Sequence, residues 1–252
     1  VVGWSVVACL GLLASAERVS TQVTPARPVW APVLSGPAAG EVEVVPVQGN
    51  VHMIAGAGGN ITVQAGPQGV LLVDTGVASM SAKVLAAMRS ISRGPLRYII
   101  NTTHGVDHTG GNVAIAPEGE IIPFREVNYT AGPQGALDTH KASVISYLTV
   151  FHRMVEITPP TPEEGWPDNT FSTPEKRLSF NDEPVVIIHL PSTTDGNSIV
   201  LFRKSDVVSA GDLLDLGGYP RLDLESGGSL QAIVDGLNRL IDVTVPEANA
   251  AG

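Results

Sequence analysis

The sequence of 252 residues contains a single cysteine, so an internal disulfide cannot contribute to its stability. Basic residues are also scarce: 15 Lys and Arg face 25 Asp and Glu, which gives a formal net charge of -10. Nucleic acids are bound through clustered Lys and Arg, and the sequence has no such cluster, so we expect no nucleic-acid partner. The acidic surplus is typical of a protein kept soluble by its charge.

The residues that are present favour a globular protein with a substantial core. Hydrophobic residues make up 43% of the chain and charged residues 16%. These fractions argue against an intrinsically disordered chain. The length fits one large domain or two small ones.

The first segment, residues 1–16, carries no charge and is mostly apolar. It ends with Ala14-Ser15-Ala16, the small-x-small pattern of a signal-peptide cleavage site. Because the sequence starts without Met, we interpret it as part of a secretory signal, with a buried helix or the end of a membrane anchor as alternatives. Cys9 lies inside it, where the sequence loosely resembles a lipoprotein processing site. Cleavage predicts a periplasmic or secreted protein without stable membrane insertion.

Residues 17–40 carry four prolines among Gly, Ala and Ser, which predicts a linker. From residue 41 to residue 252 the pattern is that of one folded domain. Apolar runs of strand length are separated there by turn residues. We expect strands at 42–45, 51–54, 61–64, 70–73, 98–100, 121–122, 185–190, 198–202 and 207–210.

Helices are expected where apolar residues recur at helical spacing. These segments are residues 80–91, a stretch around 139–154, and a final helix that Ser229 can cap. The Pro-rich stretch 158–174 predicts a long surface loop that contains Trp166 and that could cover a substrate. Strands followed by a helix, twice over, indicate an α/β (α+β) fold with two sheets packed between helices.

Polar clusters follow several of the apolar runs. Loops at strand ends are where a rigid scaffold presents reactive groups. Asp and His are ligand types that suit a hard or borderline divalent ion. Any one cluster is weak evidence, since Asp-Thr-Gly alone is a common turn and an isolated His is more often structural than a ligand. The four clusters are Asp74-Thr75-Gly76, Asp107-His108, residues 193–197 and Gly211-Asp212.

In this order and spacing the clusters resemble the metallo-β-lactamase fold superfamily. The resemblance covers about residues 45–245 and is strongest in three stretches, residues 69–76, 107–112 and 207–212. It implies an αββα sandwich of two mixed sheets flanked by helices, with a metal site at one edge of the two sheets.

The superfamily's metal-binding loop reads His-x-His-x-Asp-His. Setting Asp107 and His108 on its last pair puts Thr103 and Gly105 where two histidines belong. Thr193 occupies the place of a third. The resemblance therefore identifies a divergent member that lacks all three ligands of the first metal site.

The second metal site of the superfamily adds a bridging aspartate, matched by Asp212, and a histidine from a C-terminal Pro-Gly-His-like loop. The sequence contains no such loop before Gly252, so we expect either a truncated C-terminus or a lost ligand. The remaining metal ligands are Asp107, His108 and Asp212, with His104 as a substitute ligand if it turns inward. These ligands predict one zinc ion at most, with iron or manganese as alternatives, and no ion if the site is eroded.

Around these ligands the resemblance assigns supporting roles to Asp74, Thr193 and Asp195. Asp74 matches an aspartate that supports the metal loop, although a role in capping the turn fits it equally. Asp195 fits a role in shaping the turn before the next strand.

Two functions remain open. The first is a hydrolase in which metal-activated water, oriented by Asp107, attacks a small ester, lactone, thioester or lactam substrate. The second is a non-catalytic binding module, a pseudoenzyme with an eroded metal site, in which Asp107 and His108 cap the helix after the loop.

Overall fold

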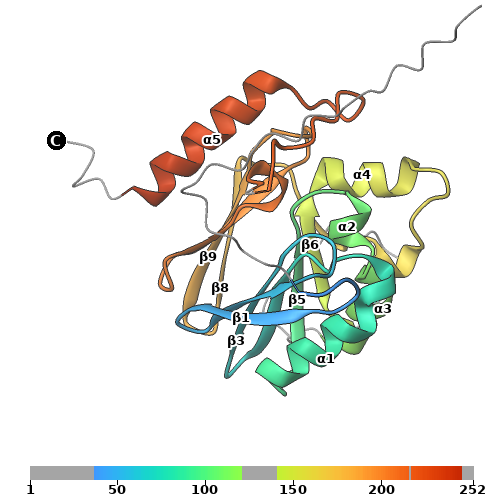
Figure 1. Cartoon of the computed structure of the whole chain (residues 1–252), viewed down its shortest axis with the longest axis vertical. Coiled ribbons are helices and arrows are strands. Elements are labelled where there is room, and N and C mark those ends of the chain that lie inside the picture. The colour runs from blue at the N-terminus through green and yellow to red at the C-terminus, as the bar shows by residue number, and fades with distance from the viewer. Residues whose placement is uncertain (1–36, 121–140, 216, 246–252) are drawn as a thin grey trace, which may run out of the picture. The chain divides into compact units, whose positions relative to one another are not determined.

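Seven strands form the first sheet of the computed structural model, in the spatial order β1-β2-β3-β4-β5-β6-β7 (Figure 1). Neighbours from β1 to β4 are antiparallel, and β4, β5, β6 and β7 run parallel to one another. The strands are β1 Glu43–Gln48, β2 Val51–Ala55, β3 Ile61–Gly66, β4 Gly69–Val73, β5 Leu96–Asn101, β6 Ser143–Tyr147 and β7 Asn169–Phe171.

Four antiparallel strands form the second sheet, in the order β11-β10-β9-β8. Their bounds are β8 Glu175–Phe180, β9 Glu183–His189, β10 Ser198–Phe202 and β11 Val207–Ser209. Each sheet thus comes mainly from one half of the chain, as the repeated pattern of strands predicts.

The helices lie on the outer faces of the two sheets, or at their edge. The α-helices are α1 Ser81–Ile91, α2 Val106–Thr109, α3 Asn112–Ile115, α4 Leu148–Glu156 and α5 Leu230–Thr244. Short 3-10 turns are η1 Ala78–Met80, η2 Ala116–Glu118, η3 Glu163–Gly165 and η4 Gly211–Leu213. As predicted, Ser229 caps α5, because its side chain accepts a hydrogen bond of 3.0 Å from the Ala232 N–H.

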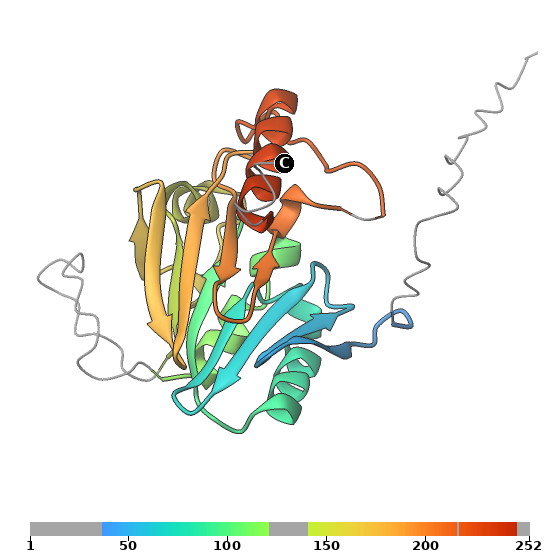
Figure 2. The same ribbon diagram turned by 90° about the vertical axis from the view of Figure 1, so that its left-hand side faces the viewer.

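Alternating side chains along the strands separate the core into three layers. In β4, Val70 and Leu72 face the cluster that contains α1, whereas Leu71 and Val73 face the second sheet. In β10, Val200 faces the first sheet, and its neighbours on the strand pack toward α5. The order is therefore helix, sheet, sheet, helix, and Figure 2 shows the two sheets side by side. This arrangement confirms the αββα sandwich.

Two local expectations were wrong. Residues 143–147 form strand β6 at the start of the expected helix, because Val144 and Ile145 are fully buried between β5 and β7. The helix begins only at Leu148. The expected loop 158–174 contains the short edge strand β7, which pairs with β6.

The structure describes residues 37–120, 141–215 and 217–245, which all belong to one compact unit. The predicted signal segment, nearly all of the linker, the strand expected at 121–122 and the last residues of the chain lie outside the described residues. Within the described residues, none of the helices combines the length and apolarity needed to cross a bilayer.

Candidate functional site

Asp74 stands where the chain leaves β4, at the edge shared by both sheets. It adopts a left-handed backbone conformation, with φ of 64°. Because β4 and β5 are parallel neighbours, this turn lies beside the end of β5. The Asp74 carboxylate accepts hydrogen bonds from the backbone N–H of Thr102 at 2.8 Å and from its hydroxyl at 2.6 Å. Asp74 therefore fixes the start of the loop that follows β5.

His108, on α2, lies between two carboxylates. Its Nδ1 is 2.8 Å from Asp74 Oδ2, and its Nε2 is 2.8 Å from Asp212 Oδ1. The His108 and Asp74 side chains are almost completely buried, and the Asp212 side chain is 31% exposed. Asp212 comes from η4, directly after β11. The imidazole thus links the end of the first sheet to the end of the second.

The two carboxylates determine the charge of His108. Burial lowers the pKa of the imidazole, but the charge of Asp74 and the hydrogen bonds to both carboxylates outweigh it and raise the pKa to about 11. Burial also raises the pKa of Asp212, and the hydrogen bond and charge of His108 lower it to a larger total extent. At neutral pH the arrangement is a protonated imidazole that donates to a carboxylate on each side.

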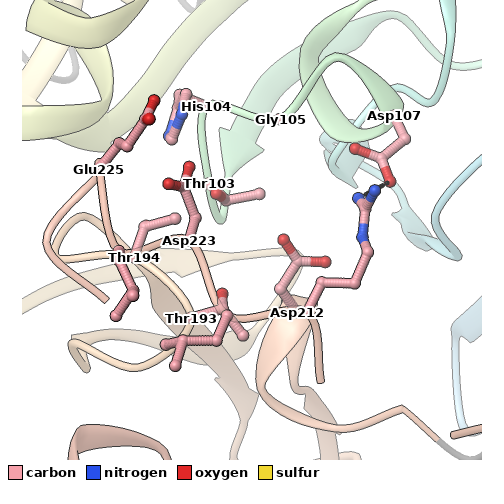
Figure 3. A pocket seen from close by; sticks show the side chains of 12 residues that line it. Thr103, His104, Gly105, Asp107, Thr193, Thr194, Asp212, Asp223 and Glu225 are labelled. Carbon is pink, nitrogen blue, oxygen red and sulfur yellow. Dashed lines mark hydrogen bonds and ion pairs between the residues drawn. The ribbon is translucent and has the colours of Figure 1, made fainter. Parts of the chain in front are cut away.

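Asp107, next to His108, faces a different partner. Its Oδ2 lies 3.4 Å from a guanidinium nitrogen of Arg221, an ion pair drawn in Figure 3. A Cβ atom added at Gly105 would lie only 2.7 Å from Asp107 Oδ1. The absence of a side chain at position 105 therefore leaves room for the Asp107 carboxylate.

A cavity of about 510 Å³ opens beside these residues. Thr103, Gly105 and Thr193, the three positions at which the resemblance expects first-site histidines, all line it. Asp107 and Asp212 also line it, together with His104, Thr194 and residues 221–225 of the loop before α5 (Figure 3). All three of these positions in the cavity wall therefore carry a small side chain or none.

Two polar atoms in the cavity wall have no hydrogen-bond partner among the described residues. They are the hydroxyl of Thr103, whose residue is only 1% exposed, and Nδ1 of His104. His104 Nε2 lies 3.5 Å from the Ser226 hydroxyl. Burial and the charge of Arg153 lower the pKa of His104, so that its imidazole is neutral at pH 7. Figure 3 shows His104 at the side of the cavity opposite Asp107, and the structure does not bring the two together.

Of the other residues expected near the metal ligands, Thr193 lines the cavity and Asp195 lies outside its wall. The Thr193 hydroxyl accepts a hydrogen bond of 2.8 Å from the Asn197 side chain. Asp195 forms a two-pronged ion pair with Arg153 of α4, with both oxygens 2.8 Å from one guanidinium nitrogen. Trp166 is not in the cavity wall; its ring packs against Phe151, and its N–H donates to the Thr161 carbonyl.

The residues of the site do not fit a two-metal centre. Thr103 and Thr193 offer only hydroxyl groups, and Gly105 offers no side chain. Both ring nitrogens of His108 already contact carboxylates. Within the ranges that the structure describes, no three His, Cys, Asp or Glu side chains gather where they could hold an ion. The structure brings His108 and Asp212 together and leaves Asp107 with Arg221. A zinc ion on Asp107, His108 and Asp212 stays a prediction.

The alternative role of Asp107 and His108 as helix caps was wrong. The residue at the cap position of α2 is Gly105, and no side chain caps that helix. Gly111 stands at the start of α3, also without a side-chain cap. The two residues instead bind Arg221 and the carboxylate pair.

Sequence reasoning missed Thr102 and the residues of the loop before α5, which are Arg221, Leu222, Asp223, Leu224 and Glu225. Thr102 belongs to the motif itself, and its position directly after a buried strand was the available signal. The loop residues show no periodicity, and no local pattern marks them. Arg221 reaches a partner 114 positions away in the chain.

A sequence model described as the metallo-beta-lactamase superfamily matches residues 54–243. Among solved structures, the chain is similar to a metallo-beta-lactamase from Pontibacter korlensis, with 17% identity, a TM-score of 0.58, and coverage of 81% of this chain and 86% of that one. The DIM-1 metallo-beta-lactamase gives 13% identity, a TM-score of 0.60 and coverage of 81% and 85%. The sec-alkylsulfatase Pisa1 from Pseudomonas sp. gives 15% identity and a TM-score of 0.56, with coverage of 81% of this chain and 36% of that one. No curated protein matches the chain.

Proposed function

Because the chain belongs to the metallo-beta-lactamase superfamily, yet carries Thr103, Gly105 and Thr193 at the first-site histidine positions, we propose that it binds a small molecule without a two-metal centre. The ligand occupies the cavity at the edge of the two sheets. In this proposal the superfamily's fold is retained as a binding scaffold.

One observation carries the proposal: all three replaced positions line the same cavity of about 510 Å³. This volume falls within the range of about 300 to 1,000 Å³ that is usual for small-molecule sites. Imidazole rings at these positions would occupy part of that space. Replacing them by Thr and Gly removes metal donors and gains room for a ligand in the same place.

The fixed position of His108 agrees with a binding role. Its ring is held on both sides by carboxylates at 2.8 Å, and one of them, Asp212, lines the cavity, so the imidazole fixes part of the cavity wall from behind. Asp107 is paired with Arg221 at 3.4 Å, but the arginine side chain is 85% exposed, so this ion pair is weaker than the contacts of His108. An ion on His108 Nε2 would have to displace or share its contact with Asp212.

A second candidate is a hydrolase that acts on a small ester, lactone, thioester or lactam. Most members of the superfamily are metal-dependent hydrolases. One contact favours this candidate: His108 Nε2 and Asp212 Oδ1 are as close as two ligands of one ion would be. It requires Asp107 to leave Arg221 and a further donor to approach.

Metal analysis of the full-length protein beside a His108→Ala variant separates the two candidates. After incubation with zinc, iron or manganese and removal of free metal, we expect no stoichiometric ion in the wild type. We also expect no turnover of a chromogenic lactam, a lactone or a thioester. Stoichiometric metal and turnover, both lost in His108→Ala, would overturn the proposal in favour of the hydrolase.

A fragment screen by ligand-observed NMR tests binding directly. The paired variants are Leu224→Trp, in the cavity wall, and Leu230→Trp, outside it; the two leucines are 71% and 69% exposed. We expect saturable binders whose affinity changes in Leu224→Trp and stays unchanged in Leu230→Trp. Equal affinities in both variants would place the binders outside the cavity.

A further inference from the structure

Carboxylates from three separate segments surround the cavity. Asp107 comes from α2, Asp212 from η4, and Asp223 and Glu225 from the loop before α5 (Figure 3). Arg221 is the single Lys or Arg among the described residues that line the cavity, and it is paired with Asp107. The wall therefore carries a surplus of negative charge.

The carboxylates of the loop are not neutralised by a neighbouring base. Asp223 accepts a hydrogen bond of 3.0 Å from the Ser226 backbone N–H, which leaves its charge in place. No ion pair of Asp223 or Glu225 with a basic side chain occurs within the described part of the chain. Several like charges around one cavity repel each other, and an incoming cation relieves that repulsion.

The Thr103 hydroxyl is a second, independent sign of a ligand. It lies in the cavity wall, its residue is only 1% exposed, and it has no hydrogen-bond partner among the described residues. Buried polar atoms are almost always hydrogen-bonded, and an exception calls for an explanation. A ligand N–H group in the cavity supplies the missing partner.

The same wall offers apolar surface. Leu222 and Leu224 line the cavity and are 39% and 71% exposed. They alternate along the chain with Asp223 and Glu225, so that one stretch presents both apolar and negative groups. This combination suits a molecule with an apolar body and a positive head.

We propose that the cavity binds an organic ammonium ion with an apolar body, held by the Asp223 and Glu225 carboxylates and the Thr103 hydroxyl, with the body against Leu222 and Leu224. This inference rests on the proposed function and adds the chemical class of the ligand. An anionic ligand would be repelled by the same carboxylates.

Three probes that share a phenylethyl group and differ in charge test the proposal. They are phenethylamine, 2-phenylethanol and 3-phenylpropanoate, titrated into the full-length protein at pH 7 and followed by calorimetry. We expect the amine to bind at least about tenfold more tightly than the alcohol, an advantage that added salt reduces. The propanoate should bind most weakly.

Four variants locate the effect. Glu225→Gln should weaken amine binding by about two- to fivefold, whereas Glu43→Gln removes the same charge from exposed strand β1 and should change nothing. Arg221→Gln should strengthen amine binding, because it removes the competing cation. Thr103→Val should weaken it without lowering the melting temperature, since the hydroxyl has no partner in the part of the chain that the structure describes.

The opposite results would overturn the proposal. Equal affinity for the three probes, or preference for the propanoate, would exclude an ammonium ion as the ligand, although the cavity could still be a small-molecule site. Binding of calcium or zinc that Glu225→Gln abolishes, without amine binding, would identify a metal instead. If none of the three probes binds, the ammonium proposal fails, and the fragment screen and metal analysis decide the proposed function separately.

Discussion

His108 Nε2 and Asp212 Oδ1 lie 2.8 Å apart, although 104 positions separate the two residues in the chain. His108 belongs to α2, which follows β5 of the first sheet, and Asp212 belongs to η4, which follows the edge strand β11 of the second sheet. Because Asp74 contacts the other side of the ring, the imidazole connects the two sheets at one edge of the sandwich. Its removal should therefore affect the whole fold.

His108→Ala should destabilise the protein by about 3 to 5 kcal/mol, because removal of one partner leaves buried carboxylates without their cation. The free energy of unfolding from denaturant titration measures the effect. His152→Ala, at an exposed position of α4, is the matched control and should change little. A loss below about 1 kcal/mol in His108→Ala would show that the pair of carboxylates does not depend on the imidazole.

Stability should fall as the pH rises above neutrality. The pKa of His108 is raised from 6.5 to about 11 in the folded protein, so the folded state keeps a proton that the unfolded state releases. The resulting stabilisation is complete below pH 6.5 and is lost progressively toward pH 11. Between these values the free energy of unfolding should drop by up to about 1.4 kcal/mol per pH unit.

Denaturant titrations from pH 6.5 to 9 measure this dependence below the range where Lys and Tyr titrate. His108→Ala is the control, since it lacks only the imidazole at position 108 and keeps the other five histidines. Parallel pH profiles in the two proteins would contradict a proton held by the carboxylates.

Gly59→Ala should destabilise the loop over His108. An added Cβ would lie 2.9 Å from His108 Cε1, and the ring cannot retreat because carboxylates hold it on both sides. We expect a loss of about 1 to 3 kcal/mol in the free energy of unfolding. Gly218→Ala is the control, since its Cβ would come no closer than 3.9 Å to Asp215. Equal melting temperatures of the two variants would show that the loop at Gly59 shifts to accommodate the added Cβ without loss of stability.

The triple variant Thr103→His, Gly105→His and Thr193→His should gain zinc binding and lose ligand binding. The substitutions return three donors to the cavity wall, and a side chain at position 105 displaces the Asp107 carboxylate from its present place. Equilibrium dialysis with zinc measures the gain, and Thr103→Val with Thr193→Val is the control that adds no donor. Absence of zinc from the folded triple variant would show that the three histidines are not sufficient to restore zinc binding in this cavity.

The local sequence was sufficient where one segment determines its own structure. Residues 69–76 predict a buried strand and a turn, and β4 is followed by the left-handed turn at Asp74. The capped helix after Ser229 was confirmed for the same reason. Residues 143–147 are different, because the apolar run around Val144 fits the period of a helix and that of a strand. Only pairing with β5 and β7 decides between them.

The site shows the same limit. The motif around Asp107 and His108 indicated where the polar groups gather, and the resemblance to the superfamily matched Asp212 to them. It did not show that Asp107 turns to Arg221 or that Asp212 contacts the imidazole directly. Those partners depend on how loops far apart in the chain meet, which residue spacing does not encode.

The loop that carries Arg221, Asp223 and Glu225 is fastened through its backbone. The Asp223 N–H donates to the Thr193 carbonyl at 3.0 Å, the Asp195 N–H donates to the Ser226 carbonyl at 2.9 Å, and the Gly228 N–H donates to the Asp223 carbonyl at 2.8 Å. These bonds do not depend on which side chains face the cavity. Substitutions of side chains such as Leu222, Leu224 and Glu225 should therefore change the cavity wall while these backbone bonds keep the loop in place.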